Sequence, residues 1–566
     1  MLRSRISIRS GPRKRNNFEA KILTKCVGNK KPTVKGDVVA SADLVLLGGI
    51  VLTMNPSQPC ADAVAVKGDR IVRVGTNEAI SKLIGENTRV IRLRGRTVIP
   101  GLIDTHIHVA DFGRFLTWID LEDVDSIKEM QNCLSKRVGE TPKGKWITGR
   151  GWDQNRFAEK RLPTRFDLDA VSPDNPVIFY HQSRQMCVVN SKALELSGLT
   201  QKASNVLDGL IDRNEETAEF TGILRDEATN LVWVVIPEPS EEELVDAAGL
   251  ACEKIVEAGV TSIHWIVLSP VEISVVRKLY AQERLSLRVY VILPANLLDR
   301  TLGSGLREGF TDEALKFGGM VIFADGYLAA RTAALLQPYS DDPAGNGRLL
   351  CVQEEMNALA AKIHKADFQL VIHAVGDKAV DAALTTIEVT STEAPRKDLR
   401  NRIEQAAVLN EGLIERMKKQ QVIVSVQPRV IDSEFSVWSA TDHLGLKRTR
   451  WLFPLKTLLK EGIRVVGGSD CPMEPLSPLS GIQAAVEREF FPEERITVED
   501  ALRIYTVNAA YASFEESIKG SIETGKLADI TVLSRDPRAV PPNEIEKIAV
   551  QMTIVGGRVV YPKLFS

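Results

Sequence analysis

Short apolar segments alternate with amphipathic stretches through the middle of this chain, between residues 98 and 467. Eight of the apolar segments have the length and composition of strands: Val98–His106, Val260–Trp265, Leu287–Leu293, Met320–Ala324, Gln369–His373, Arg402–Gln405, Val422–Val426 and Arg464–Gly467. The stretches with helical spacing include Glu241–Ala258, Gln353–Ala366, Asp377–Thr390 and Asn410–Gln420. Eight strands that alternate with helices predict an α/β fold, namely a (β/α)₈ TIM barrel. A doubly wound sheet is the alternative, but no Gly-x-Gly-x-x-Gly or phosphate-binding loop follows a predicted strand.

Two features of the chain add to a simple barrel. The first and second predicted strands lie roughly 150 residues apart, which is too long for one crossover connection. This gap predicts an insertion over residues 113–239 that could cover the mouth of the barrel. Strand-like segments also fill residues 42–97 and 523–566, and these two ends predict one small β-sandwich domain. The barrel is then expected over residues 98–522.

The composition is that of an ordinary globular protein, with 44% hydrophobic residues, 26% charged residues and a net charge of −2. This balance favours neither nucleic acid nor a membrane as a partner, and the longest apolar run, Leu44–Leu52, is too short to span a bilayer. The seven cysteines are scattered and lack a Cys-x-x-Cys motif, so a reducing, cytoplasmic location is expected. Residues 1–41 are basic, which favours a disordered tail; an organelle transit peptide or an extension outside the fold is the alternative.

Two of the seven histidines, His106 and His108, lie one residue apart at the end of the first predicted strand. Residues i and i+2 of a strand point to the same side, so both imidazoles are expected to project together. Neutral imidazole is a common ligand of divalent metals. A pair of solvated or core histidines is the competing interpretation, because a two-ligand motif is weak evidence by itself. The pair therefore predicts at most half of a metal site.

Further ligand-type residues occur where other predicted strands end, and this end of a TIM barrel carries the chemistry. His373 ends the fifth strand and Asp470 follows the eighth. Three imidazoles and one carboxylate suit a divalent metal, most readily Zn²⁺ with Mn or Fe as alternatives, and leave a position for water. Such a metal makes hydroxide available for attack on a carbonyl, and Asp470 can then move a proton to a leaving amine. A turn-forming role is the alternative for Asp470, since Ser-Asp before Pro is common in turns.

The segment Pro100–His108 resembles the opening signature of the amidohydrolase superfamily, and Gly525–Ile530 resembles its closing signature. Other segments are similar to the branch that contains the N-substituted formamide deformylases: residues 151–154, 162–165, 190–194, 222–228, 323–326 and 331–335. The resemblance extends from about residue 42 to residue 562. It implies a metal-dependent barrel hydrolase that cleaves an amide, formamide or related C–N bond of a small molecule, and that commonly forms a homodimer.

Four positions depart from the pattern that this resemblance implies. Val321 stands where many members carry a carbamylated lysine that can bridge two metals, and Gln405 stands where a histidine usually ends the sixth strand. Gln185 and Val430 replace two further histidines. Because valine cannot be carbamylated and glutamine is a poor zinc ligand, these departures predict one metal held by the four residues named above. Gln405 can still bond a water or a substrate carbonyl, but it cannot shuttle protons near neutral pH.

Five other residues are candidates for substrate binding: Trp152, Asp153, Asp325, Arg331 and His264. Structural roles compete for several of them, because Trp152 suits the core of the insertion and Asp325 can pair with Arg331. The leading hypothesis is a one-metal hydrolase acting on a non-peptide C–N bond. A non-catalytic or regulatory binding protein and a one-metal deaminase are the two alternatives, and the sequence does not identify the substrate.

Overall fold

The computed structural model describes residues 41–183, 185–199, 210–303, 312–393, 395 and 397–563. The chain divides into a unit over Met1–Ser41 and a unit over Ala42–Ser566. The disordered tail expected over residues 1–41 therefore lies, apart from Ser41, outside the described residues. Within these described ranges, none of the helices has the length and apolarity needed to cross a bilayer.

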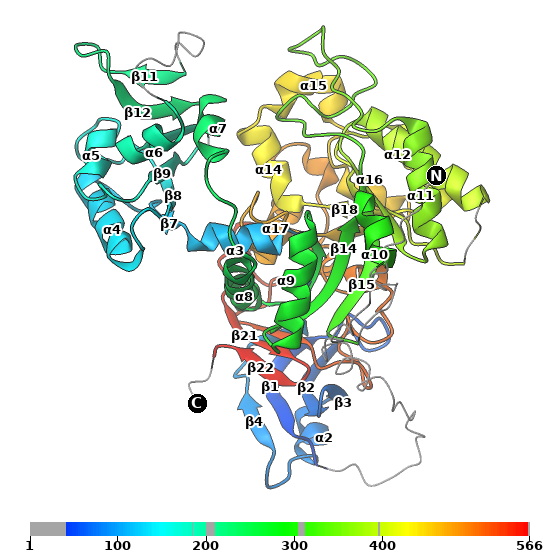
Figure 1. Cartoon of the computed structure of the whole chain (residues 1–566). Helices are drawn as coiled ribbons and strands as arrows, with labels where there is room; N and C mark the ends of the chain where they lie inside the picture. Colours follow the sequence, from blue (N-terminus) through cyan, green and yellow to red (C-terminus); the bar gives the residue numbers. More distant parts are fainter. Residues whose placement is uncertain are drawn as a thin grey trace, which may run out of the picture. The chain divides into compact units, whose positions relative to one another are not determined.

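The predicted TIM barrel is confirmed as eight parallel strands that pair in chain order (Figure 1). The strands are β6 (Leu102–Ile107), β13 (Val260–Ile266), β14 (Arg288–Pro294), β15 (Leu315–Phe323), β16 (Gln369–Ala374), β17 (Arg402–Gln405), β18 (Ile423–Val426) and β19 (Arg464–Gly467). A parallel bridge between Ile107 and Cys471 links the last strand to the first. This bridge brings the segment with Asp470 beside the histidines that end β6.

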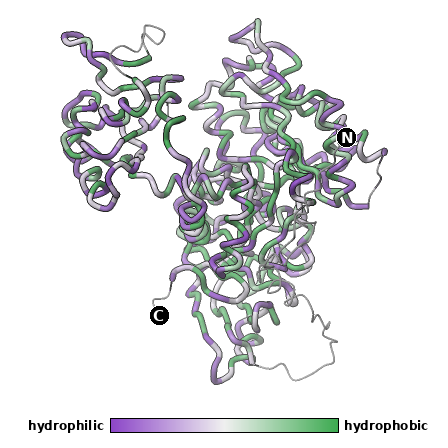
Figure 2. Tube along the Cα trace, in the orientation of Figure 1, coloured by the Kyte–Doolittle hydropathy of each residue, from purple (hydrophilic) through white to green (hydrophobic). Residues whose placement is uncertain are grey.

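Helices cover the outside of the barrel and bury the outward-facing side chains of its strands. They include α8 (Glu241–Glu257), α9 (Pro270–Ala281), α11 (Gln353–Lys365), α12 (Asp377–Glu393), α13 (Glu411–Gln420), α14 (Pro428–Ser436), α16 (Leu455–Lys460), α17 (Pro478–Glu487), α18 (Val498–Ile504) and α19 (Val507–Ala512). Helix α8 begins with a capping box, in which Ser240 and Glu243 satisfy each other's backbone N–H groups. Polar and apolar residues alternate along these helices (Figure 2), as expected for helices with one face on a core.

The first predicted strand is two strands, which corrects the expectation of one strand over Val98–His106. Strand β5 (Thr97–Pro100) belongs to the small β-domain, and β6 belongs to the barrel. Gly101 separates them where the backbone runs close to Thr261, since a Cβ on Gly101 would lie 2.1 Å from the Thr261 hydroxyl. Glycine is required at this passage between the two domains because no side chain fits there.

The small β-domain is one bent sheet built from both ends of the chain, in the order β22-β21-β20-β5-β1-β2-β3, with β4 also paired to β1. Its strands are β1 (Leu44–Leu52), β2 (Cys60–Lys67), β3 (Arg70–Gly75), β4 (Arg89–Arg92), β5, β20 (Ile530–Leu533), β21 (Val550–Val555) and β22 (Arg558–Tyr561). The register of β1 shifts between Leu47 and Val51, where Gly48 has a φ of 73°. Both halves of β1 pair with β2, but on its other edge the first half pairs with β4 and the second with β5. One apolar core joins side chains from strands β1–β3, β5, β20 and β21.

The insertion after the first barrel strand has its own six-stranded sheet, in the order β11-β12-β10-β9-β8-β7. Its strands are β7 (Ile119–Asp120), β8 (Ile147–Trp152), β9 (Val177–His181), β10 (Met186–Val189), β11 (Ile211–Arg213) and β12 (Phe220–Arg225). Helices α4 (Ile127–Glu140) and α5 (Arg165–Asp169) contribute to one apolar cluster, and α6 (Ser191–Leu196) and α7 (Ala228–Trp233) contribute to a second. Helix α3 (Val109–Thr117) leads from the barrel into this layer.

Candidate metal centre

The side chains of His106, His108 and Asp470 converge at the carboxyl end of the barrel. The Nε2 atoms of His106 and His108 lie 3.5 Å and 3.3 Å from Oδ1 of Asp470. Two atoms bound tetrahedrally to one Zn²⁺ at about 2.0–2.2 Å lie about 3.3–3.6 Å from each other. The three residues form the one group of His, Cys, Asp or Glu side chains with metal-site spacing in the described part of the chain. Their separations and chemistry fit a divalent cation.

The Nδ1 atom of each histidine lies beside a hydrogen-bond acceptor. Nδ1 of His106 lies 2.7 Å from Oε2 of Glu404, and Nδ1 of His108 lies 3.3 Å from the carbonyl oxygen of Ile266. Both partners are acceptors, so each Nδ1 carries the proton and each Nε2 presents its lone pair to the shared centre. This arrangement fixes the tautomer that metal binding by Nε2 requires.

Asp470 is positioned by its backbone and by Gln405. Its backbone N–H donates to the carbonyl of His106 at 2.8 Å, and its φ of 59° turns the chain directly after β19. The Gln405 amide donates to Oδ2 of Asp470 at 3.1 Å, which leaves Oδ1 facing the two histidines. Burial raises the pKa of Asp470, but His106 and His108 outweigh this effect and hold that pKa below its usual range. The carboxylate is therefore ionised at neutral pH.

His373 is the second-to-last residue of β16. It is not one of the three residues whose ligand atoms all lie within 4.8 Å of one another. The side chain is 3% exposed, and its Nδ1 has no hydrogen-bond partner among the described residues. Burial lowers the pKa of His373 to about 4, with the nearby charge of His106 acting in the same direction. A neutral imidazole with an unpaired buried nitrogen is suited to act as a fourth ligand.

A buried ion pair supports the site from inside the barrel. The Arg402 guanidinium lies 2.7 Å from Glu404, and both side chains are completely buried. Arg402 also donates to Nδ1 of His264 at 2.8 Å and to the carbonyl of Thr105 at 3.0 Å. Burial raises the pKa of Glu404, but Arg402 and His106 lower it further, so the net shift is downward. Glu404 is thus an ionised carboxylate that holds the Nδ1 proton of His106.

The sequence matches the family model for the amidohydrolase family over residues 89–561. The chain belongs to the amidohydrolase family. It is 32% identical to YtcJ of Bacillus subtilis (strain 168), over 91% of this chain and 99% of that protein. It is 28% identical to the N-substituted formamide deformylase of Arthrobacter pascens, over 93% and 99% of the two chains.

Among solved structures, this amidohydrolase is similar to an uncharacterized metal-dependent hydrolase from Pyrococcus furiosus. The TM-score is 0.72 and the identity is 30%, over 88% of this chain and 99% of that one. The predicted family, its branch and the barrel fold are confirmed by these comparisons.

The predicted substrate-binding residues of this amidohydrolase occupy different surroundings. Trp152 is fully buried in the core of the insertion, where its indole N–H donates to the carbonyl of Phe179 at 2.8 Å. Asp153 is also buried in the insertion and accepts from the Gln182 amide at 2.9 Å. His264 is fully buried behind the metal centre, on the far side of Arg402. The structure therefore brings none of the three to the group of His106, His108 and Asp470.

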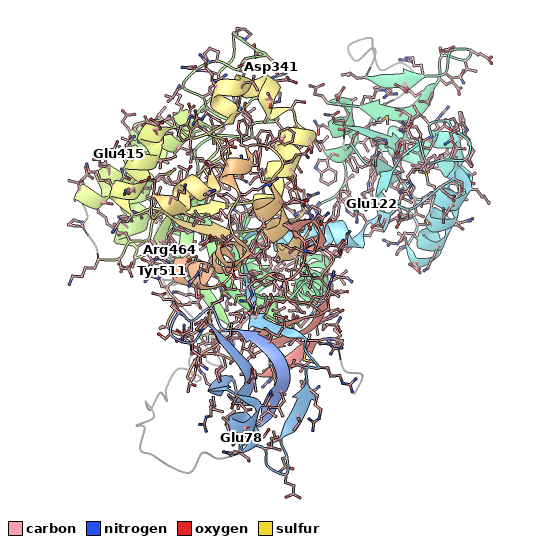
Figure 3. All side chains as sticks on the ribbon, turned by 180° about the vertical axis from the view of Figure 1, so that it is seen from behind. Glu78, Glu122, Asp341, Glu415, Arg464 and Tyr511 are labelled. Atoms are coloured by element: carbon pink, nitrogen blue, oxygen red, sulfur yellow. The ribbon has the colours of Figure 1, made fainter. Side chains whose placement is uncertain are left out.

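Asp325 and Arg331 do not pair with each other. Asp325 accepts from the backbone N–H groups of Ala334, Val375 and Gly376 at 2.8–2.9 Å, and it thereby fixes the loop after His373. Burial raises the pKa of Asp325 to about 6. The half-exposed Arg331 forms an ion pair with Asp341 at 2.8 Å, and Figure 3 labels this aspartate. The proposed mutual pair is wrong, and both residues have structural partners.

The positions that depart from the branch have mainly apolar or peripheral surroundings. Val321 is buried inside the barrel, where an apolar cluster joins it with Ile266, Ile292 and Val371. Val430 is buried in α14, and Gln185 is exposed in the insertion. Gln405 alone among the four departures contacts the metal centre, through Asp470.

Sequence reasoning missed an aromatic surface at the cavity between α3 and the insertion. The cavity has a volume of about 790 Å³ and is lined in part by Phe115, Trp118, Tyr180 and Trp233. The three lining segments are far apart in sequence and share no periodicity. No local pattern in the sequence therefore points to this surface.

Proposed function

We propose that this amidohydrolase is a one-metal hydrolase that cleaves the C–N bond of an N-substituted amide or formamide. The observation that carries the proposal is the convergence of the His106 and His108 Nε2 atoms on Oδ1 of Asp470, with both Nδ1 atoms held by acceptors. His373 would complete the ligand set from β16. Three imidazoles and one carboxylate suit Zn²⁺ and leave a position for water or substrate. The class of bond follows from the name of the Arthrobacter relative.

A divalent metal bound by these residues would polarise a carbonyl oxygen and lower the pKa of a coordinated water toward neutrality. The residues of the chain itself supply the proton transfer. Oδ2 of Asp470 accepts a proton during attack on the carbonyl carbon and returns it to the leaving nitrogen, which departs as an amine. The Gln405 amide lies against the same oxygen and orients it, since an amide can donate a hydrogen bond but cannot take up a proton near neutral pH.

The surroundings of Val321 support one metal rather than two. A bridging ligand would have to reach the centre from β15, but this position carries valine within an apolar cluster. On β17, Gln405 bonds to Asp470 and offers an amide in place of an imidazole. Both replacements remove possible metal ligands from the carboxyl end of the barrel. The remaining donor set is sufficient for a single ion.

Metal analysis combined with a substrate panel tests this proposal. The purified protein should bind one equivalent of Zn²⁺, Mn²⁺ or Fe²⁺ and should release amine and formate from N-substituted formamides. Asp470→Asn should abolish turnover, whereas Asp174→Asn at the exposed surface is the matched control and should keep it. Failure to bind metal after reconstitution with all three ions would leave a binding protein instead of a hydrolase. Release of ammonia from aminoheterocycles without amide cleavage would favour a deaminase.

A further inference from the structure

The cavity between α3 and the insertion is lined in part by sequence neighbours of two residues of the candidate metal centre. Its lining includes Asp111, three residues after His108, and Pro472, two residues after Asp470. The remaining lining comes mainly from α3, β8, β9 and α7. With a volume of about 790 Å³, it lies within the usual range of small-molecule sites. A substrate that reaches the metal centre therefore has space for a large substituent on this side.

Three aromatic side chains form one wall of this cavity. The ring of Trp118 stacks on Tyr180 with centroids 5.7 Å apart, and it meets Trp233 edge-on at 6.1 Å. Tyr180 and Trp233 also meet edge-on, at 6.2 Å. All three side chains are only partly buried, although burial of a large aromatic side chain usually stabilises a protein. The wall is thus a rigid π-surface that a flat ring can cover.

The charged side chains around this wall are already paired. Arg150 contacts Asp120 and Glu122 and lies 3.9 Å above the ring of Phe115. Glu122 is labelled in Figure 3, on the insertion. Arg156 lies 3.5 Å from Asp123, and Arg114 lies 3.5 Å from Glu238. Among the described residues that line the cavity, each arginine therefore has an acidic partner, and the charge balance of this part of the lining suits a neutral ligand.

We infer that this cavity binds a flat aromatic N-substituent of the amide substrate, with Trp118, Tyr180 and Trp233 as the residues that determine specificity. This inference rests on the proposed function and adds the class of substituent to it. Stacking of a ring on the wall would point the amide of a neutral substrate toward Asp111 and Pro472, and so toward His108 and Asp470. The aromatic wall then selects the amine half of the substrate, whereas the metal centre acts on the carbonyl half.

A pair of formamides that differ only in ring aromaticity tests the inference. For the metal-loaded enzyme, we expect kcat/KM to be about tenfold higher for N-(2-naphthylmethyl)formamide than for N-(decahydro-2-naphthylmethyl)formamide, as expected for stacking beyond apolar burial. Trp118→Leu and Trp233→Leu should each reduce this ratio several-fold through KM, and Trp118→Phe should retain most of it. Phe166→Leu, an exposed aromatic side chain elsewhere in the insertion, is the matched control and should leave the ratio unchanged. Metal content should stay constant in all variants.

A binding measurement separates failure of the cavity from failure of the proposed function. If no amide is cleaved, calorimetry with 2-naphthalenemethanol and decahydro-2-naphthalenemethanol still measures whether the aromatic wall prefers an aromatic ring. Preference for the aromatic alcohol that falls in Trp118→Leu would support the cavity while the hydrolase proposal fails. An aromatic preference that is absent, or that persists unchanged in both folded leucine variants, would overturn the inference.

Discussion

Replacement of Glu404 by glutamine should weaken both the barrel and the metal centre. The carboxylate accepts from Nδ1 of His106 at 2.7 Å and from the Arg402 guanidinium at 2.7–2.9 Å, and none of these side chains is more than marginally exposed. Glu404→Gln leaves the Arg402 cation buried without its counter-ion. Breaking a buried pair by neutralising one partner costs about 3–5 kcal/mol. Urea denaturation of the metal-free protein, followed by circular dichroism, measures this loss.

The same substitution should reduce metal affinity by about 10–100-fold, because His106 loses the carboxylate that fixes its tautomer and increases its basicity. Competition with a chelator of known Zn²⁺ affinity measures this change. The double variant Glu404→Gln/Arg402→Met separates the two effects, since it removes the stranded cation without restoring the carboxylate that accepts from His106. Stability should recover in part, and metal affinity should not. Full recovery of metal affinity in the double variant, or wild-type affinity in the single one, would refute the role assigned to Glu404.

Three further substitutions test other groups of the barrel. Asp325→Ala should cost about 3 kcal/mol or more in denaturant unfolding, because three buried N–H groups lose their acceptor; an unchanged midpoint would contradict this. Burial and the neighbouring Glu474 raise the pKa of Glu434 from 4.5 to about 8, so the folded state keeps a proton that the unfolded chain releases above about pH 4.5. Stability should therefore fall as pH rises from about 4.5 to 8, and Glu434→Gln should remove up to about 5 kcal/mol of this fall, at about 1.4 kcal/mol for each pH unit. If the free energy of unfolding changed with pH in the same way for the wild-type protein and Glu434→Gln, the pKa assignment would be wrong. Arg331→Ala should leave the melting temperature and KM unchanged, because it breaks only the surface pair with Asp341; a several-fold rise in KM would instead restore its predicted role in substrate binding.

The barrel was predictable from the sequence because its strands are short, buried on both faces and separated by amphipathic helices. The observed strands agree with the expected segments to within a few residues, and the largest difference is at the fourth strand, where β15 begins at Leu315 and the prediction began at Met320. The break at Gly101 was not predictable by periodicity, since the apolar run continues through it. The contact with Thr261, which is distant in sequence, explains why a glycine occurs there.

Part of the metal centre was predictable for a similar local reason. His106 lies in β6 and His108 directly follows the last residue of this strand, so their common direction was expected from the two-residue repeat of an extended chain. The proximity of Asp470 to these two histidines depends on closure of the barrel between β6 and β19, and the number of predicted strands implied this closure. The substrate-binding roles of Trp152 and His264 remain predictions, and the structure places both side chains in the interior of the protein. The aromatic wall of the cavity comes from three distant segments, so no local pattern announces it.

The orientation of His106 follows from the charges buried beneath it. Arg402 and Glu404 alternate with Ile403 on a strand that is buried on both faces, so both charged side chains must be satisfied inside the barrel. Arg402 satisfies one carboxylate oxygen of Glu404, and the N–H of His106 satisfies the other. The imidazole is thus held with Nδ1 inward and Nε2 outward by the requirement that the buried carboxylate keep its donors, because Oε2 of Glu404 would lose the N–H of His106 in any other orientation. Since this requirement does not involve a metal, the ligand geometry is set before an ion binds, and the ion meets a site that needs little reorganisation.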